Sequence, residues 1–317
     1  MNSAAFGQAL LTPKRGLRPL GRPRWLPPAA WPFQTDALDV GGSTVAVTDA
    51  GHGPVLLFVH TGFWSFVWRD VMQRLSSEFR CVCFDAPSTG QSGRLAVRDI
   101  TLARAADVTT AVLERLDLHD VTLIVHDLGG PSGIAGAGRV PDRVGALCVV
   151  NAFGWTPSGA AFRGMLALMG SSAMREVDAW TGVLPKVTST AFGIGRHMAA
   201  HDRRVFLAGI GRQGTRAFHA YLNDARRADA VYAEASRALT IPFRRLPVVT
   251  IFGERNDPLG FQPQWKRLFP NVRQIVIPKG NHFPMCDDPD LVSRSIRELQ
   301  REVVRSTNPF GRTGRES

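Results

Sequence analysis

Continuous apolar runs alternate with helix-spaced segments from residue 36 onward. Residues 44–49 (TVAVTD) alternate between apolar and polar positions, as in a strand with one buried face. The runs 55–60 (VLLFVH) and 80–87 (RCVCFDAP) are typical of strands buried on both faces. Residues 102–116 instead repeat apolar residues at helical spacing.

The same alternation continues toward the end of the chain. The pattern predicts strands and helices in turn: a strand at 121–127, a glycine-rich helix start at 129–138, strands at 145–151 and 246–253, a helix near 262–269, a strand at 272–278 and a helix at 289–304. Such alternation predicts an α/β fold, with a mostly parallel sheet and helices on both faces.

The strand pattern stops between the two halves of this core. We expect residues 36–151 and 246–305 to form the core and residues 152–245 to form a helical cap over the carboxyl ends of the strands. Residues 1–35 contain six prolines, five basic residues and no acid, which indicates an extended arm. Residues 306–317 form a short tail.

Two tryptophans of the arm, Trp25 and Trp31, are candidates for contacts that hold it on the body of the protein. A loosely ordered tail is the alternative interpretation of the same residues.

Composition narrows the function classes. The formal net charge of +11 comes from 34 arginines and four lysines against 27 acids, but the arginines are scattered, which disfavours nucleic-acid binding. The four cysteines have no metal-binding or disulfide spacing, so we expect buried thiols, no metal and no cofactor.

No apolar stretch reaches the roughly 18–20 residues that cross a bilayer, and no signal peptide is recognisable. We expect a cytoplasmic enzyme for small molecules, with a homodimer as one option for its assembly.

Three polar residues follow three separate core strands: Asp127, Asp257 and His282. Loops after parallel strands meet at one edge of a sheet, so these side chains can converge. Glu254 competes with Asp257 on the same loop, and Asp127 alone could simply cap the next helix.

Several motifs resemble the haloalkane dehalogenase and epoxide hydrolase branch of the α/β-hydrolase superfamily over about residues 36–305. These are HDLGG at 126–130, DAPSTGQS at 85–92, VHTGFWSFVWRD at 59–70 and GNHFPMCDDPD at 280–290. The resemblance implies the α/β-hydrolase fold and the order nucleophile, acid, histidine. It favours Asp257 over Glu254 because the acid of that branch directly precedes a proline.

The resemblance also implies a covalent mechanism. Asp127 would attack carbon and form an ester, and His282 would activate the water that hydrolyses this ester. Asp257 would orient the imidazole. Backbone N–H groups of Leu128 and of the turn at Gly62 and Phe63 would stabilise the oxyanion.

The resemblance is less specific about the leaving group of the reaction. Dehalogenases of this branch have a tryptophan after the nucleophile, where this chain has Leu128, which cannot donate a hydrogen bond. Epoxide hydrolases use tyrosines of the cap, and AFHAYLND at 217–224 resembles the segment that carries one of them, which indicates a catalytic role for Tyr221. Trp64, Trp180 and Tyr232 are the candidates for substrate contacts.

These residues favour opening of an epoxide on a bulky apolar molecule. Haloalkane dehalogenation is the main alternative. An esterase or lactonase would need a serine at position 127, and a binding module without activity would normally have lost part of the triad.

Overall fold

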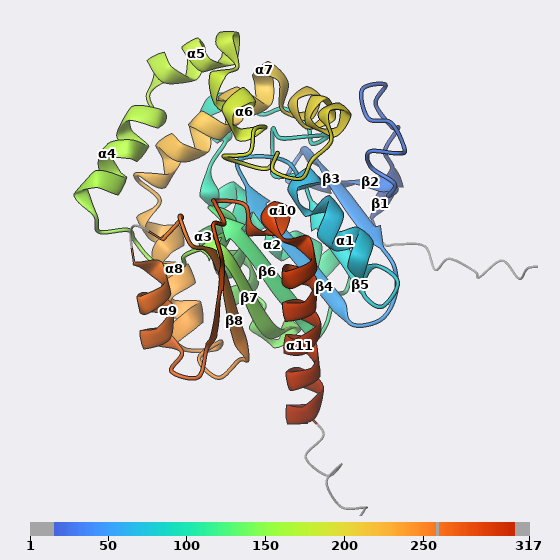
Figure 1. Ribbon diagram of the computed structural model, residues 1–317, viewed down its shortest axis with the longest axis vertical. Coiled ribbons are helices and arrows are strands. Elements are labelled where there is room, and N and C mark those ends of the chain that lie inside the picture. The colour runs from blue at the N-terminus through green and yellow to red at the C-terminus, as the bar shows by residue number, and fades with distance from the viewer. Residues whose placement is uncertain (1–15, 258–259, 308–317) are drawn as a thin grey trace, which may run out of the picture.

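A nine-stranded sheet organises residues 16–257 and 260–307, the part of the chain that the computed structural model describes (Figure 1). The order of its strands is β1-β2-β3-β5-β4-β6-β7-β8-β9. The strands are β1 (Leu17–Pro19), β2 (Thr35–Val40), β3 (Ser43–Ala50), β4 (Val55–Thr61), β5 (Arg80–Phe84), β6 (Val121–Asp127), β7 (Val144–Ala152), β8 (Val248–Gly253) and β9 (Arg273–Ile277).

The sheet is parallel from β5 to β9, and β1, β2 and β3 add an antiparallel edge. The apolar runs lie in the central strands, where both faces are buried, which confirms the predicted α/β class. The register pairs His60 with His126 and Thr61 with Asp127, so the last residues of β4 and β6 are neighbours.

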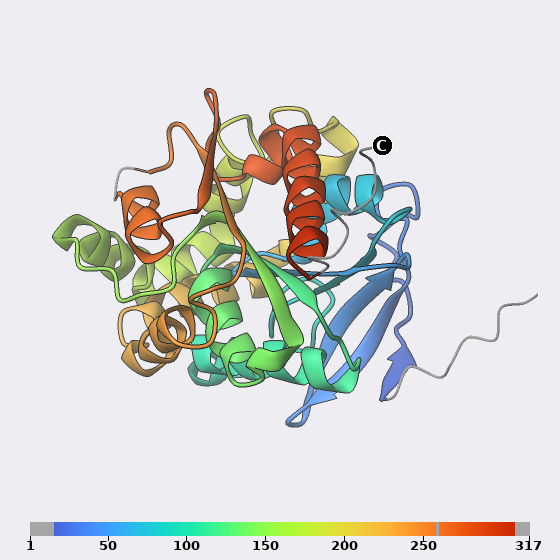
Figure 2. The same cartoon turned by 90° about the horizontal axis from the view of Figure 1, so that it is seen from below.

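Helices cover both faces of the sheet, as Figure 2 shows with the sheet seen obliquely from below. One face packs against α2, α3 and α8, and the other packs against α1 and α11. The helices are α1 (Arg69–Leu75), α2 (Leu102–Arg115), α3 (Gly129–Gly138), α4 (Ala160–Met169), α5 (Ser172–Thr181), α6 (Val183–Thr188), α7 (Ala200–Ala225), α8 (Asp229–Thr240), α9 (Phe261–Leu268), α10 (Pro284–Asp287) and α11 (Pro289–Thr307), with short 3-10 turns at Ser65–Trp68, Val97–Asp99 and Pro141–Arg143.

The segment between β7 and β8 is helical, as predicted. Helices α4–α7 lie beyond the carboxyl ends of the strands (Figure 1). Helix α8 returns to the face of the sheet, where it packs against α3 and Glu234 pairs with Arg139 at 2.8 Å. The predicted cap, residues 152–245, therefore contains helices in two positions, α4–α7 beyond the ends of the strands and α8 against a face of the sheet.

The arm is joined to the body over its described part, residues 16–35. β1 pairs with β2, and the Arg22 guanidinium donates hydrogen bonds to the carbonyls of Trp31 and Phe33 at 2.7 and 2.9 Å. The rings of Trp25 and Trp31 lie 5.3 and 6.1 Å from that of Trp64. Residues 1–15 of the predicted arm and 308–317 of the predicted tail lie outside the described residues.

We expect Trp31→Ala to lower the free energy of unfolding by about 3–5 kcal/mol, the usual cost of truncating a buried tryptophan. The reason is that Trp31 is 1% exposed and packs against Phe33, Trp64 and Phe66. Denaturant titration measures this loss, and the exposed Arg24→Ala should change stability by less than about 0.5 kcal/mol. Equal small effects of the two variants would show that the arm is not part of the core.

Candidate active site

Asp127 stands on a sharp turn between β6 and α3. Its φ is +51°, a left-handed conformation that is uncommon for residues other than glycine. The turn requires small neighbours, because a Cβ on Gly129 would lie 2.6 Å from the Val59 carbonyl oxygen and one on Gly130 would lie 2.2 Å from that of Phe153. This packing holds the carboxylate at the carboxyl edge of the sheet, with 22% of the side chain exposed.

His282 faces this carboxylate from the loop between β9 and α10. Its Nε2 lies 3.8 Å from Oδ1 of Asp127, so the structure brings these two predicted residues together. Burial alone would raise the pKa of Asp127, but the nearby His282, with smaller effects of His126 and the Leu128 N–H, lowers it below the ordinary value. The carboxylate is therefore ionised at neutral pH.

The two side chains open into a cavity of about 510 Å³ between the sheet edge and the cap helices. Seven of the residues that line it are phenylalanines. Its lining consists of Phe63, Asp127, Asn151, Phe153, Phe162, Met165, Met169, Leu184, Val187, Thr188, Phe192, Gly193, Phe218, Leu222, Asn256, Phe261, His282 and Phe283. An ionised carboxylate in a cavity with a mostly apolar lining can react with an apolar molecule that binds there.

A buried pair of histidines connects the strand ends behind Asp127. His60 and His126 have their Nδ1 atoms 3.0 Å apart, and both side chains are almost completely buried. The backbone N–H of Phe63 donates to Nε2 of His60 at 3.2 Å, and Nε2 of His126 lies 2.8 Å from the carbonyl oxygen of His282.

These contacts fix where the protons lie. Nε2 of His60 accepts from Phe63, so its proton is on Nδ1 and is donated to Nδ1 of His126. The proton of His126 is then on Nε2 and is donated to the carbonyl of His282. Both rings are neutral, in accord with burial, which lowers the pKa of His60 to about 3 and that of His126 well below its ordinary value.

Asn151 holds the histidine loop from the other side, and sequence reasoning missed it. Its amide nitrogen donates to the carbonyls of Asn281 and His282 at 2.9 and 2.8 Å, and its oxygen accepts from the N–H of Gly253 at 3.1 Å. The residue is the last but one of β7 and has a φ of +40°. A polar residue directly after an apolar run was the available signal, the same one that singled out Asp127.

The structure does not bring Asp257 to His282. Its carboxylate accepts hydrogen bonds from the N–H groups of Phe261 and Gln262 at 2.6 and 3.0 Å, at the start of α9. The competing Glu254 accepts from the N–H of Lys279 at 2.7 Å. Among the contacts of the described residues, the carboxylate that faces His282 is that of Asp127.

The predicted catalytic phenol of Tyr221 and the three predicted substrate contacts lie outside this cavity. The hydroxyl of Tyr221 donates to the Pro87 carbonyl at 2.9 Å, and that of Tyr232 donates to the Ala225 carbonyl at 2.8 Å. Burial raises the pKa of both phenols. The indole of Trp64 donates to the Phe206 carbonyl, and Trp180 is 66% exposed. These four side chains do not line the cavity that holds Asp127 and His282.

Two of the three predicted oxyanion donors have partners in this structure. The Phe63 N–H donates to Nε2 of His60, and the Leu128 N–H interacts with Asp127 itself. Gly62 adopts a φ of +120° in front of Phe218. The oxyanion role of Leu128, Gly62 and Phe63 stays a prediction.

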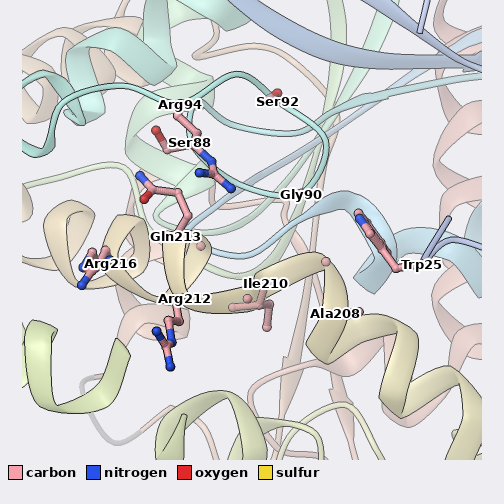
Figure 3. Close-up of a pocket in the computed structure, with 13 residues that line it drawn as sticks. Trp25, Ser88, Gly90, Ser92, Arg94, Ala208, Ile210, Arg212, Gln213 and Arg216 are labelled. Atoms are coloured by element: carbon pink, nitrogen blue, oxygen red, sulfur yellow. The ribbon is translucent and has the colours of Figure 1, made fainter. Parts of the chain in front are cut away.

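A second cavity of about 410 Å³ lies between the loop at residues 88–94 and a kink of α7, where Gly211 has a φ of +51°. Figure 3 shows Arg94 and Gln213 extending into the space between loop and helix, whereas Arg212 extends to the other side of α7. Neither Asp127 nor His282 lines this cavity. Within residues 16–257 and 260–307, no cluster of three or more His, Cys, Asp or Glu side chains could hold a metal ion.

Comparison with known proteins agrees with the fold. Residues 54–289 match the family model described as alpha/beta hydrolase fold. Haloalkane dehalogenase 2 of Mycobacterium tuberculosis is 25% identical over 280 residues, 86% of this chain and 96% of that protein. The haloalkane dehalogenase of Mycolicibacterium smegmatis is 28% identical over 291 residues, 85% of this chain and 92% of that protein.

Solved structures agree with the same fold. That of a haloalkane dehalogenase from Bradyrhizobium elkani superposes with a TM-score of 0.72 at 17% identity and covers 86% of this chain and 99% of its own. That of a haloalkane dehalogenase from Agrobacterium tumefaciens has a TM-score of 0.72 at 19% identity and covers 84% and 96% of the two chains.

We expect the free energy of unfolding to fall as the pH drops below about 6.5, because the unfolded chain binds protons that buried His60 and His126 do not. Each histidine contributes a slope of up to about 1.4 kcal/mol per pH unit. His60→Gln should remove one such contribution in urea titrations between about pH 7 and 4.

Trp31→Ala is the matched control for this measurement, because it lowers stability without removing a titrating group. An unchanged slope in His60→Gln would contradict the neutral pair.

Proposed function

The chain belongs to the α/β-hydrolase fold family, and on that premise we propose a hydrolase that forms a covalent ester between Asp127 and an apolar small molecule. The observation that carries the proposal is the elbow geometry of Asp127. An ionised carboxylate lies 3.8 Å from an imidazole in a cavity lined with phenylalanines.

In the first step, a carboxylate oxygen of Asp127 attacks the substrate carbon, and the leaving group departs with the bonding electron pair. In the second step, His282 takes a proton from water while the water oxygen attacks the carbonyl carbon of the ester. The alcohol leaves with the proton that His282 had taken, and the carboxyl group of Asp127 then releases the second proton of the water to solvent and returns to its ionised form.

The second step places a positive charge on His282. The acid predicted to orient this imidazole, Asp257, does not contact it in this structure. Asp257 would have to release the two N–H groups of α9 to reach the imidazole. In its present position the histidine loop is instead held through its backbone, by Asn151 and His126. We propose that these two uncharged side chains position His282.

Two observations favour a halide as the leaving group, and so hydrolysis of a carbon–halogen bond. The relatives reported above carry the name haloalkane dehalogenase. The phenols of Tyr221 and Tyr232, which an epoxide would need as proton donors, bind backbone carbonyls outside the cavity. This evidence reverses the order that the sequence motifs favoured.

Epoxide opening is the second candidate because of one observation. The position after Asp127 is Leu128, whose side chain offers a departing halide no N–H donor. The amide of Asn256 and the hydroxyl of Thr188 line the cavity and do not hold the histidine loop, and either could bind a leaving group.

We expect Asp127→Asn to be folded and to lose activity, because an amide is a poor nucleophile. His282→Gln should accumulate an ester on Asp127, since the histidine is needed to break the ester but not to form it. Mass analysis of the peptide that contains Asp127 detects this adduct, and a single turnover in heavy-oxygen water should place the label in the aspartate. Full turnover by Asp127→Ala would exclude the mechanism.

A substrate panel decides between the two leaving groups. We expect apolar bromo- and chloroalkanes to be hydrolysed faster than epoxides of matched size, because no cavity phenol protonates the epoxide oxygen. Tyr221→Phe should leave both rates unchanged and should cost roughly 1–3 kcal/mol of stability by leaving the Pro87 carbonyl unpaired. Faster epoxide turnover that Tyr221→Phe slows would restore epoxide hydrolysis to first place.

A further inference from the structure

Exposed apolar side chains are concentrated on the outer helices of the cap. Seven of the ten large apolar side chains that are exposed among the described residues lie between Met165 and Phe192. They belong to a segment that we call the cap tip, residues 160–192, which comprises α4, α5, α6 and the turn that follows, at the outer end of the molecule (Figure 1). Phe192 is 80% exposed and Trp180 is 66% exposed. Exposed patches of this kind mark interaction surfaces.

Positive charge is concentrated around the cap tip. The cap tip contains three basic residues (Arg163, Arg175 and Lys186) and two acids (Glu176 and Asp178). Two arginines of α7 add to this charge, because Arg212 lies over the ring of Trp180 and Arg216 pairs with Glu176. Both acids are already engaged, Glu176 by Arg175 and Arg216 and Asp178 by the buried His219.

From this combination we propose that the cap tip binds the surface of an anionic lipid bilayer. Indole and phenyl rings enter the headgroup region, and arginines beside them attract anionic headgroups. Trp180 and Arg212 have this arrangement already, with the guanidinium carbon 3.8 Å from the centre of the indole ring. A second copy of the chain fits less well, because two surfaces with an excess of positive charge would repel each other.

The mouth of the cavity opens inside this surface. Met165, Val187 and Phe192 line the cavity and are also 40%, 49% and 80% exposed. An apolar molecule dissolved in the bilayer would then enter the cavity without crossing bulk water. This last consequence depends on the proposed function, whereas binding to the bilayer does not.

Vesicle flotation tests the binding without any measurement of activity. The full chain should float with vesicles of phosphatidylcholine that contain about 30% phosphatidylglycerol and should not float with phosphatidylcholine alone. Raising the salt from about 0.05 to 0.5 M should weaken the binding, because it screens the headgroup charge.

Two pairs of variants localise the contact. Val177→Ser with Trp180→Ser should weaken binding about ten- to hundredfold, whereas Ile241→Ser should not. Ile241 is a matched control, because it is 59% exposed, as Val177 is 60%, but precedes β8 at the amino end of the strands. Arg163→Gln with Lys186→Gln should weaken binding about fivefold for each charge removed, and Arg244→Gln with Arg245→Gln should not.

Three results would overturn the proposal. The first is no flotation with anionic vesicles. The second is an equal loss in both charge pairs, which would indicate attraction by the net charge alone. The third is self-association in ultracentrifugation that Val177→Ser with Trp180→Ser abolishes while vesicle binding persists, which would make the cap tip an interface between two copies.

Discussion

The close approach of α3 to the ends of strands β4 and β7 is the constraint on which the rest of the site depends. Gly129 and Gly130 leave no room for a Cβ against the carbonyls of Val59 and Phe153. A larger residue would push the helix away from the sheet and would release the strained turn. The left-handed conformation of Asp127 costs of order 1–3 kcal/mol, and such strain persists only where the surrounding packing imposes it.

This packing fixes Asp127, whereas uncharged hydrogen bonds fix His282. The His60–His126 pair joins the end of β4 to the end of β6 and then to the carbonyl of His282. Every ring nitrogen of the pair has one partner and the pair carries no net charge, so its burial leaves no polar atom unsatisfied. A second proton on His60 would break the bond from Phe63, and one on His126 would break the bond between the two rings. The neutral state of the pair is therefore a requirement of the geometry.

Much of the fold could be predicted from the sequence, because strands buried on both faces need uninterrupted apolar runs. The runs at 55–60 and 121–127 correspond to β4 and β6, and the glycines after Asp127 mark the turn to α3. β1 could not be predicted, because it is held by its pairing with β2 and has no apolar pattern of its own. The meeting of Asp127 with His282 also followed, since loops after parallel strands share one edge of the sheet.

The orientation of single side chains could not be predicted in the same way. An aspartate just before a helix has the same sequence pattern whether its carboxylate faces a histidine or the helix N–H groups, and Asp257 does the latter. Tyr221 lies on a cap helix, as expected. Its hydroxyl points to the carbonyl of Pro87 and not into the cavity, and this direction is decided by packing between segments that are distant in the sequence. Asn151 was missed because its amide acts on the backbone of another loop, which no local motif records.

The low pKa of Asp127 has a consequence for the proposed chemistry. The same neighbours that keep the carboxylate ionised also stabilise it before it reacts, and this stabilisation weakens as its charge passes to the leaving group. A carboxylate of low pKa is also a weaker nucleophile toward carbon. In the proposed reaction, a leaving group that carries negative charge well offsets both effects. Most of the cavity lining is apolar, so the few polar side chains in it, Asn256 among them, are the ones that can stabilise the departing anion. These side chains therefore have the largest influence on which substrates react.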